Sequence, residues 1–182
     1  MQSVRKSKKD SSARSHQSLL KLLASFRGAR VCIVGDVMLD VFSYGTSTRL
    51  SPEAPVPVVL FEREYAMPGG AANVARNVAS LGGRPHLFGV VGKDEAGARL
   101  KRLLREEGVI CTGVRTAQSY QTTEKQRIVI SGSHALRLDR EVHQVPSAAL
   151  RVMERDICAA LQHADVLVFV DYRKGALTQA SV

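Results

Sequence analysis

The stretch Arg30-Val31-Cys32-Ile33-Val34-Gly35-Asp36 decides the fold class of this 182-residue chain. After its first residue it is apolar without alternation until it ends on glycine and aspartate, which is typical of a strand buried on both faces of a parallel sheet. Residues 166–171 repeat the pattern as Val-Leu-Val-Phe-Val-Asp, and residues 87–92 give a shorter example. Asp36 and Asp171, which close the two longer runs, are therefore expected at the carboxyl ends of their strands.

Two helical patterns lie between these strands. Residues 95–107 carry leucines at helical spacing, with Asp94 before them as an N-cap and Gly108 just past the end. A second helix is predicted to begin at Ser147 and to end near His163. Strands that alternate with helices of this length need crossover connections, so the sequence predicts an α/β fold with a mostly parallel sheet flanked by helices.

Two further regions do not fit that layer. Residues 56–62 are strand-like but contain a proline, which assigns them to a sheet edge. Residues 123–130 and 134–140 alternate polar and apolar side chains and are joined by Ser-Gly-Ser, which predicts a hairpin. Together these segments predict a small antiparallel β lid on the α/β body, over about residues 43–66 and 120–141.

Composition and charge limit the classes of protein to which the chain can belong. Its 45% hydrophobic content suits one folded unit, predicted over residues 19–182, and its three scattered cysteines are typical of a reduced, cytoplasmic protein. Nearly half of the net charge of +9 falls in residues 1–18, which predicts a disordered basic tail. That tail lacks aromatic residues for base stacking, so we expect no specific nucleic-acid binding. No apolar run is long enough for a membrane span.

The segment Pro68-Gly69-Gly70-Ala71-Ala72-Asn73 removes side-chain bulk just before a predicted helix. Glycine permits unusual backbone angles and a close approach of other groups, and the start of a helix presents unpaired N–H groups. A polyhydroxyl or anionic ligand would fit there. The alternative is a tight strand-to-helix turn that packs against its own sheet.

Polar residues are expected to gather at one edge of the sheet, because ligands of open α/β sheets bind beyond the carboxyl ends of the strands. Carboxylates accept hydrogen bonds from sugar hydroxyls, and an amide both donates and accepts. For any single aspartate, a turn or capping role is the alternative. The predicted sugar-binding residues are Asp36, Asp40, Gly69, Gly70, Asn73 and Asp171. Neither Gly-x-Gly-x-x-Gly nor Gly-x-x-x-x-Gly-Lys-Ser/Thr occurs, which excludes the usual dinucleotide loop and P-loop.

Four motifs follow one another at a characteristic spacing. They are Gly-Asp-Val-Met-Leu-Asp at 35–40, Ser-Pro-Glu-Ala-Pro-Val-Pro-Val at 51–58, Gly-Gly-Ala-Ala-Asn-Val-Ala at 69–75 and Asp-Tyr-Arg-Lys-Gly-Ala-Leu at 171–177. In this order and spacing, the chain resembles the ribokinase-like (PfkB) sugar kinases from about residue 19 to residue 182. More narrowly, the second motif is similar to that of the heptose 7-phosphate kinase branch, the kinase module of the bifunctional enzyme that makes ADP-heptose.

This resemblance implies roles for the motif residues. Asp40 would bind sugar hydroxyls, while Asn73 with Gly69 and Gly70 would hold the opposite side of the sugar. The lid would cover the substrate and pair with a second subunit, giving a homodimer. At least one basic residue on or near the lid would bind the phosphate of the sugar, and for any one of them a solvated surface charge is the alternative. The basic candidates are Arg49, Lys125, Arg127, Arg137 and Lys174.

The resemblance also implies a reaction, the transfer of the γ-phosphoryl group of ATP to the anomeric hydroxyl of D-glycero-D-manno-heptose 7-phosphate, with Mg²⁺. This step serves ADP-heptose and lipopolysaccharide biosynthesis. The family's catalytic aspartate, in a Gly-Ala-Gly-Asp turn, and its Asn-x-x-Glu motif do not occur in the 182 residues. We therefore expect a kinase domain that is incomplete on its C-terminal side, with the base beyond Val182 and no activity from this chain alone.

Two other functions stay open from the sequence. The chain could belong to a kinase of the same family that acts on another sugar, a sugar acid or a nucleoside. It could also be a non-catalytic fragment that acts through its lid in dimerisation or in another interaction.

Overall fold

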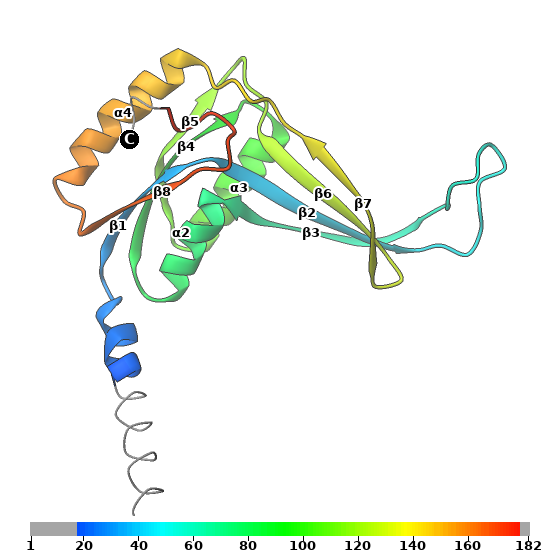
Figure 1. The fold of residues 1–182 in the computed structure, drawn as a ribbon, viewed down its shortest axis with the longest axis horizontal. Coiled ribbons are helices and arrows are strands. Elements are labelled where there is room, and N and C mark those ends of the chain that lie inside the picture. The colour runs from blue at the N-terminus through cyan, green and yellow to red at the C-terminus, as the bar shows by residue number, and fades with distance from the viewer. Residues whose placement is uncertain (1–17, 179–182) are drawn as a thin grey trace, which may run out of the picture.

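The computed structural model describes residues 18–178, which form two β-sheets (Figure 1). Sheet A has the strand order β5-β4-β1-β8, and all its pairings are parallel. Sheet B has the order β3-β2-β6-β7 and projects away from sheet A and its helices. The predicted tail over residues 1–18 falls almost wholly outside the described residues.

Sheet A confirms the strands that were predicted from unbroken apolar runs. β1 (Arg30–Gly35) lies between β4 (Arg84–Gly92) and β8 (Val166–Val170). The edge strand β5 (Ile110–Ala117) has no counterpart among the predicted strands. Its sequence mixes polar and apolar residues, as an edge strand can, and so lacks the continuous apolar run of its neighbours.

Helices cover both faces of sheet A, as predicted. α2 (Ala71–Ser80) and α3 (Glu95–Glu106) share one buried hydrophobic cluster with the sheet, and α4 (Ser147–Leu161) closes a second cluster on the other face. The predicted N-cap of α3 is confirmed, because the Asp94 side chain accepts a hydrogen bond from a backbone N–H of the first helical turn. The α/β fold therefore rests on two cores, one on each side of a single parallel sheet.

Sheet B corrects the prediction of a wholly antiparallel lid. Its outer strands β3 (Leu60–Gly70) and β7 (Ser133–Arg140) pair antiparallel, but its central strands β2 (Val37–Thr46) and β6 (Thr123–Ile130) are parallel. The physical reason is that both central strands start beside sheet A. β2 follows β1 directly, and the residue before β6, Thr122, accepts a hydrogen bond from the end of β4.

Two segments of the predicted lid have different outcomes. The hairpin over residues 123–130 and 134–140 is confirmed as β6 and β7. The strand predicted over residues 56–62 begins only at Leu60, and the preceding Pro57 takes part in an isolated bridge with Leu50. The loop between β2 and β3 lies at the far end of sheet B, away from the helices (Figure 1).

Side chains alternate across sheet B and give it two different faces. One row on one face contains Met67, Asp40, Lys125 and Asp139. The next row outward on that face contains Tyr65, Phe42, Arg127 and Arg137. We call this side the polar face of sheet B. The opposite side, which includes Leu39 and Val41, is turned toward α3.

Apolar side chains are exposed on β8, at one edge of sheet A. Within the described part of the chain β8 is an edge strand, and the exposed fractions are 50% for Val166, 36% for Leu167 and 40% for Phe169. Among residues 18–178, no helix combines the length and the apolar content that crossing a membrane requires.

Candidate functional site

Asp40 and Gly69 meet at the base of sheet B, where β2 pairs with β3. A side chain on Gly69 would overlap the Oδ2 atom of Asp40. The glycine therefore lets the Asp40 carboxylate lie against the β3 backbone. The close approach predicted for the Gly-Gly segment is thus made, at least on one side, by a carboxylate of the same chain.

Gly70 and Asn73 lie at the start of α2, directly after this contact. Gly70 is the N-cap residue and has a φ of 58°, in the left-handed region that favours glycine. The N–H of Ala71 donates to the Asp36 carbonyl at 2.8 Å, but no side chain caps the helix. Asn73 is partly buried and makes no side-chain hydrogen bond with another described residue. The first turn of the helix therefore carries an amide side chain, four residues after the glycine that contacts Asp40.

Asp36 holds the loop that follows β8. Its side chain is only 2% exposed and accepts three backbone hydrogen bonds, from Tyr172 at 2.8 Å, Lys174 at 3.0 Å and Ala176 at 3.0 Å. Both carboxylate oxygens are therefore engaged within the chain, and this position braces the loop. A contact between Asp36 and a sugar stays a prediction that none of these hydrogen bonds supports.

Asp171 has a local role in the same loop. Its side chain is exposed and accepts a hydrogen bond from the backbone N–H of Arg173 at 2.7 Å. Arg173 has a φ of 58°, so the hydrogen bond stabilises a turn with left-handed backbone. The turn role was the alternative for a single aspartate, and contact of Asp171 with a sugar stays a prediction.

Arg127 is the basic candidate that contacts Asp40. Its Nη1 atom lies 2.6 Å from Oδ1 of Asp40, and the exposed fractions of the two side chains are 24% and 19%. The guanidinium also lies over the Phe42 ring, 5.0 Å from its centroid. An ion pair in such a partly dry place is stronger than one at the open surface. Asp40 is therefore paired internally on the polar face.

Lys125 and Lys174 share a carboxylate just beyond the Asp40 row. Lys174 lies in the loop braced by Asp36, and its Nζ atom is 2.7 Å from Oε2 of Glu141. The Nζ atom of Lys125 lies 3.5 Å from the same Glu141 oxygen and 2.9 Å from Asp139. Both lysine side chains are only 15% exposed. Glu141 therefore joins sheet B to the loop after β8.

Both carboxylates of this network are acidified by their basic neighbours. The hydrogen bond from Lys174, followed by the charges of the two lysines, holds the pKa of Glu141 below its ordinary value against the effect of burial. Burial alone would raise the pKa of Asp139, but hydrogen bonds from Lys125 and Arg137 outweigh it and lower the pKa. The network is therefore charged at neutral pH. Asp139 and Glu141 were not predicted from the sequence.

The remaining basic candidates lie farther from the Asp40 carboxylate. Arg137 pairs with Asp139 at 2.9 Å, but its side chain is 57% exposed. Arg49 is exposed in the loop between β2 and β3, at the outer end of sheet B. The structure thus brings together Asp40, Gly69, Lys125 and Arg127, with Gly70 and Asn73 at the start of the helix that follows Gly69. It places Lys174 next to Lys125 through Glu141 and leaves Arg49 apart.

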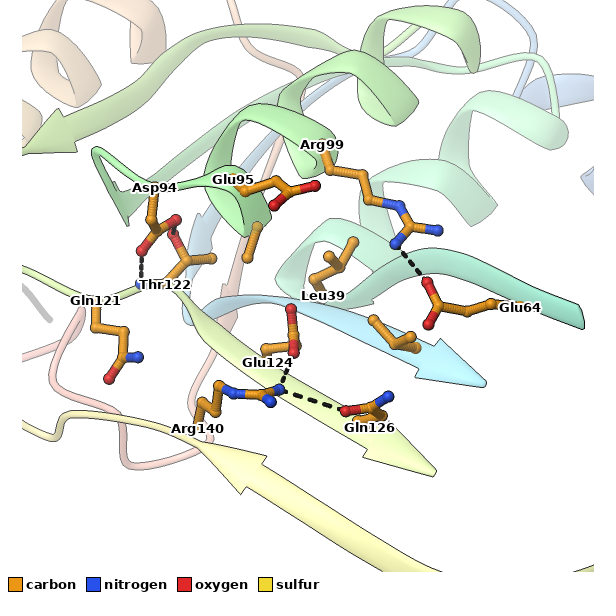
Figure 2. Close-up of a pocket in the computed structure, with 12 residues that line it drawn as sticks. Leu39, Glu64, Asp94, Glu95, Arg99, Gln121, Thr122, Glu124, Gln126 and Arg140 are labelled. Carbon is orange, nitrogen blue, oxygen red and sulfur yellow. Dashed lines mark hydrogen bonds and ion pairs between the residues drawn. The ribbon is translucent and has the colours of Figure 1, made fainter. Parts of the chain in front are cut away.

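A cavity of about 400 Å³ lies on the opposite side of sheet B, between that sheet and α3 (Figure 2). Figure 2 shows that both arginines of its lining are paired, Arg99 with Glu64, and Arg140 with Glu124 and Gln126. No residue predicted to bind the sugar or its phosphate lines this cavity. This cavity is therefore separate from the candidate sugar site.

The candidate site has the chemistry of a sugar phosphate site without that of a metal site. Within residues 18–178, no cluster of three or more histidine, cysteine, aspartate or glutamate side chains could hold a metal ion. The carboxylate and amide near α2 suit hydroxyl groups, and the nearby ammonium and guanidinium groups suit a phosphate. The Mg²⁺ that the sequence leads us to expect is therefore not assigned to these residues.

Comparisons with known proteins show the family of the chain. A family model described as pfkB family carbohydrate kinase matches residues 29–176. The bifunctional protein HldE of Caulobacter sp. (strain K31) is 49% identical over 163 residues, which cover 88% of this chain and 33% of that protein. The D-beta-D-heptose 7-phosphate kinase of Bordetella bronchiseptica is 48% identical over 149 residues, which cover 82% of this chain and 47% of that protein. This chain thus spans between a third and about half of the length of these curated relatives.

A solved structure supports the fold independently. The tetrameric inhibited form of phosphofructokinase-2 from Escherichia coli aligns with a TM-score of 0.61 at 20% identity, over 85% of this chain and 48% of that one. Similarity at that level of identity concerns the arrangement of the sheets and helices alone. It agrees with a parallel sheet A that carries a second sheet.

Proposed function

The chain belongs to the pfkB family of carbohydrate kinases, and from that premise we propose that it carries the sugar-binding part of an ATP-dependent kinase for a heptose 7-phosphate. The observation that carries the proposal is the polar face of sheet B. There the Asp40 carboxylate lies against Gly69, just before the helix that carries Asn73, and Lys125 stands beside Asp40 in the register. The choice of heptose 7-phosphate is supported by the identity of 48% to a relative that bears this name.

In the proposed reaction, the anomeric oxygen of the sugar forms a bond to the γ-phosphorus of ATP. The bond from that phosphorus to the β–γ bridging oxygen breaks, and the hydroxyl proton passes to a base. Asp40 and Asn73 would fix the sugar, which matters because phosphoryl transfer depends mainly on positioning and charge stabilisation. When bound, Mg²⁺ neutralises phosphate charge, but we assign neither that ion nor the base to residues 18–178.

We also propose that sheet B contacts a second copy of the chain and that the protein is cytoplasmic, where ATP and phosphorylated sugars are available. The outer part of the polar face supports the homodimer. The Phe42 ring stacks on Tyr65 at 4.8 Å between centroids, and the Tyr65 ring faces Tyr44 at 5.8 Å. Tyr65 remains 41% exposed. A row of partly exposed aromatic rings is typical of a protein interface.

The substrate class can be tested by titrating the chain calorimetrically with three compounds. We expect heptose 7-phosphate to bind at least about tenfold more tightly than ribose or adenosine, since buried charged groups that go unpaired penalise the wrong ligand. A preference for ribose or adenosine would end the assignment to heptose kinases while leaving the family unchanged. Absence of binding by all three would contradict the placement of the sugar site.

Asn73 should contribute directly to sugar affinity. For Asn73→Ala we expect roughly tenfold weaker binding of heptose 7-phosphate, since the amide would supply one or two hydrogen bonds to the sugar at about 1 kcal/mol each. The matched control is Asn77→Ala, one turn later on the same helix, where the side chain is exposed. Equal affinities for the two variants would show that the sugar lies elsewhere.

A further inference from the structure

Two lysines around Glu141 form a site that could bind an anion, and the carboxylate of Glu141 occupies that site in the structure. Lys125 comes from sheet B and Lys174 from the loop after β8, yet both ammonium groups are directed at the same Oε2 atom of Glu141. With both lysine side chains only 15% exposed, water can screen their mutual repulsion only in part. The two lysines therefore need negative charge beside them. In this structure the Glu141 carboxylate serves both, and Asp139 also pairs with Lys125.

One of the two lysines is a neighbour of Asp40 in sheet B. Lys125 stands directly beside Asp40 in the register of β2 and β6, and neighbouring strands lie about 4.8 Å apart. Of the other cations on the polar face, Arg127 is held by Asp40, and Arg137 has a side chain that is 57% exposed. Lys125 and Lys174 are thus two little-exposed cations that can exchange Glu141 for a ligand while the Asp40 pair, and the pair of Lys125 with Asp139, stay intact.

We infer that Lys125 and Lys174 form the phosphate subsite of this protein, and that Glu141 occupies the subsite as an internal anion until the phosphate of the substrate displaces it. The inference rests on the proposed function for the identity of the ligand as a sugar phosphate. A phosphate carries up to two negative charges and three free oxygens, so it can pair with both ammonium groups more fully than one carboxylate oxygen does. Once Glu141 is displaced, the phosphate takes over the link between sheet B and the loop after β8, through the same two lysines.

The Glu141 side chain has a second partner, which is exposed to solvent. Its second oxygen, Oε1, lies 3.3 Å from Nε2 of His143, whose side chain is 64% exposed. His143 also lies within 3.4 Å of the Arg173 carbonyl, through its Nδ1 atom. A small rotation of the Glu141 side chain toward this exposed imidazole would clear the two lysines. A sugar without a phosphate has no anion to replace Glu141 between the two lysines. The arrangement therefore favours phosphorylated substrates.

The inference is tested by measuring the affinity of the chain for inorganic phosphate at fixed ionic strength, with ³¹P NMR. For Glu141→Gln we expect roughly tenfold tighter binding, because the competing charge is removed while the size of the side chain is kept. Lys125→Met and Lys174→Met should each weaken binding at least about tenfold. The matched control is Glu106→Gln, which removes the same charge from an exposed ion pair on α3 and should change the affinity by less than about twofold.

Equal phosphate affinities for Glu141→Gln and Glu106→Gln would overturn the inference, as would full phosphate binding by Lys174→Met. Should Glu141→Gln fail to fold, the unmodified chain still decides the question. The ¹³C signal of the Glu141 side-chain carboxylate should shift as phosphate is added, and a signal that stays unchanged at saturation contradicts displacement. Failure of heptose 7-phosphate to compete with bound phosphate would instead refute the proposed substrate and leave the phosphate subsite standing.

Discussion

Replacing Asp40 with asparagine is expected to weaken the binding of heptose 7-phosphate by about 100-fold or more. The carboxylate lies on the polar face against Gly69, where it can accept hydrogen bonds from two sugar hydroxyls. Charge-assisted hydrogen bonds contribute about 1.5 kcal/mol each, so the loss of two corresponds to about 3 kcal/mol. Calorimetric titration of the Asp40→Asn chain measures the effect.

The control for this variant must separate sugar binding from the loss of the internal pair with Arg127. Asp156→Asn serves, because Asp156 pairs with Arg115 and its side chain is 21% exposed, close to the 19% of Asp40. Both variants should lose a similar amount of stability, measured as a change in Tm. Only Asp40→Asn should lose sugar affinity, and a similar affinity for both variants would remove Asp40 from the proposed sugar site.

Strands of sheet A could be predicted where their own sequence is an unbroken apolar run. A strand buried on both faces must be apolar at every position, and residues 31–35 of β1 show this. β8 has the same unbroken apolar run, although it is an exposed edge strand within the described residues. β5 lies at an edge and needs no such run, so its pattern did not distinguish it from a loop. β2 was missed for another reason, since its first residues were interpreted only as a ligand-binding motif.

The parallel pairing at the centre of sheet B could not be predicted from local patterns. Alternation of polar and apolar residues indicates a strand, but it does not say which strand lies beside it. Two strands that leave the same end of the body become parallel neighbours, and that depends on where β1 and β4 end in space. The rows that place Lys125 beside Asp40 follow from this register alone.

Some residues of the candidate site could be predicted from the sequence, and others could not. Asp40, Gly69 and Asn73 were predicted from motifs, and the structure places Asp40 against Gly69 just before the helix that carries Asn73. Glu141 and Asp139 gave no signal, because a charged residue in a hairpin is most often a solvated one. The three hydrogen bonds to Asp36 could not be predicted either, because their donors are backbone N–H groups, which every residue except proline has.

Replacing Asp36 with asparagine is expected to lower the free energy of unfolding by about 3 kcal/mol. The carboxylate accepts three backbone hydrogen bonds and is 2% exposed, whereas an amide offers one oxygen and would direct its NH₂ group at a donor. Hydrogen bonds to a charged group contribute about 1.5–3 kcal/mol, and an unsatisfied buried group adds a further penalty. Denaturant unfolding measures the loss, and amide hydrogen exchange at residues 172, 174 and 176 should become fast.

The matched control is Asp171→Asn in the same loop, where the side chain is exposed and accepts one backbone hydrogen bond. We expect it to cost less than about 1 kcal/mol. Asp36→Asn should also weaken phosphate binding, because the loop that it releases carries Lys174. If Asp36 were a sugar ligand and not a brace, its variant would lose sugar affinity while the loop amides stayed protected, and that outcome would separate the two roles of this carboxylate.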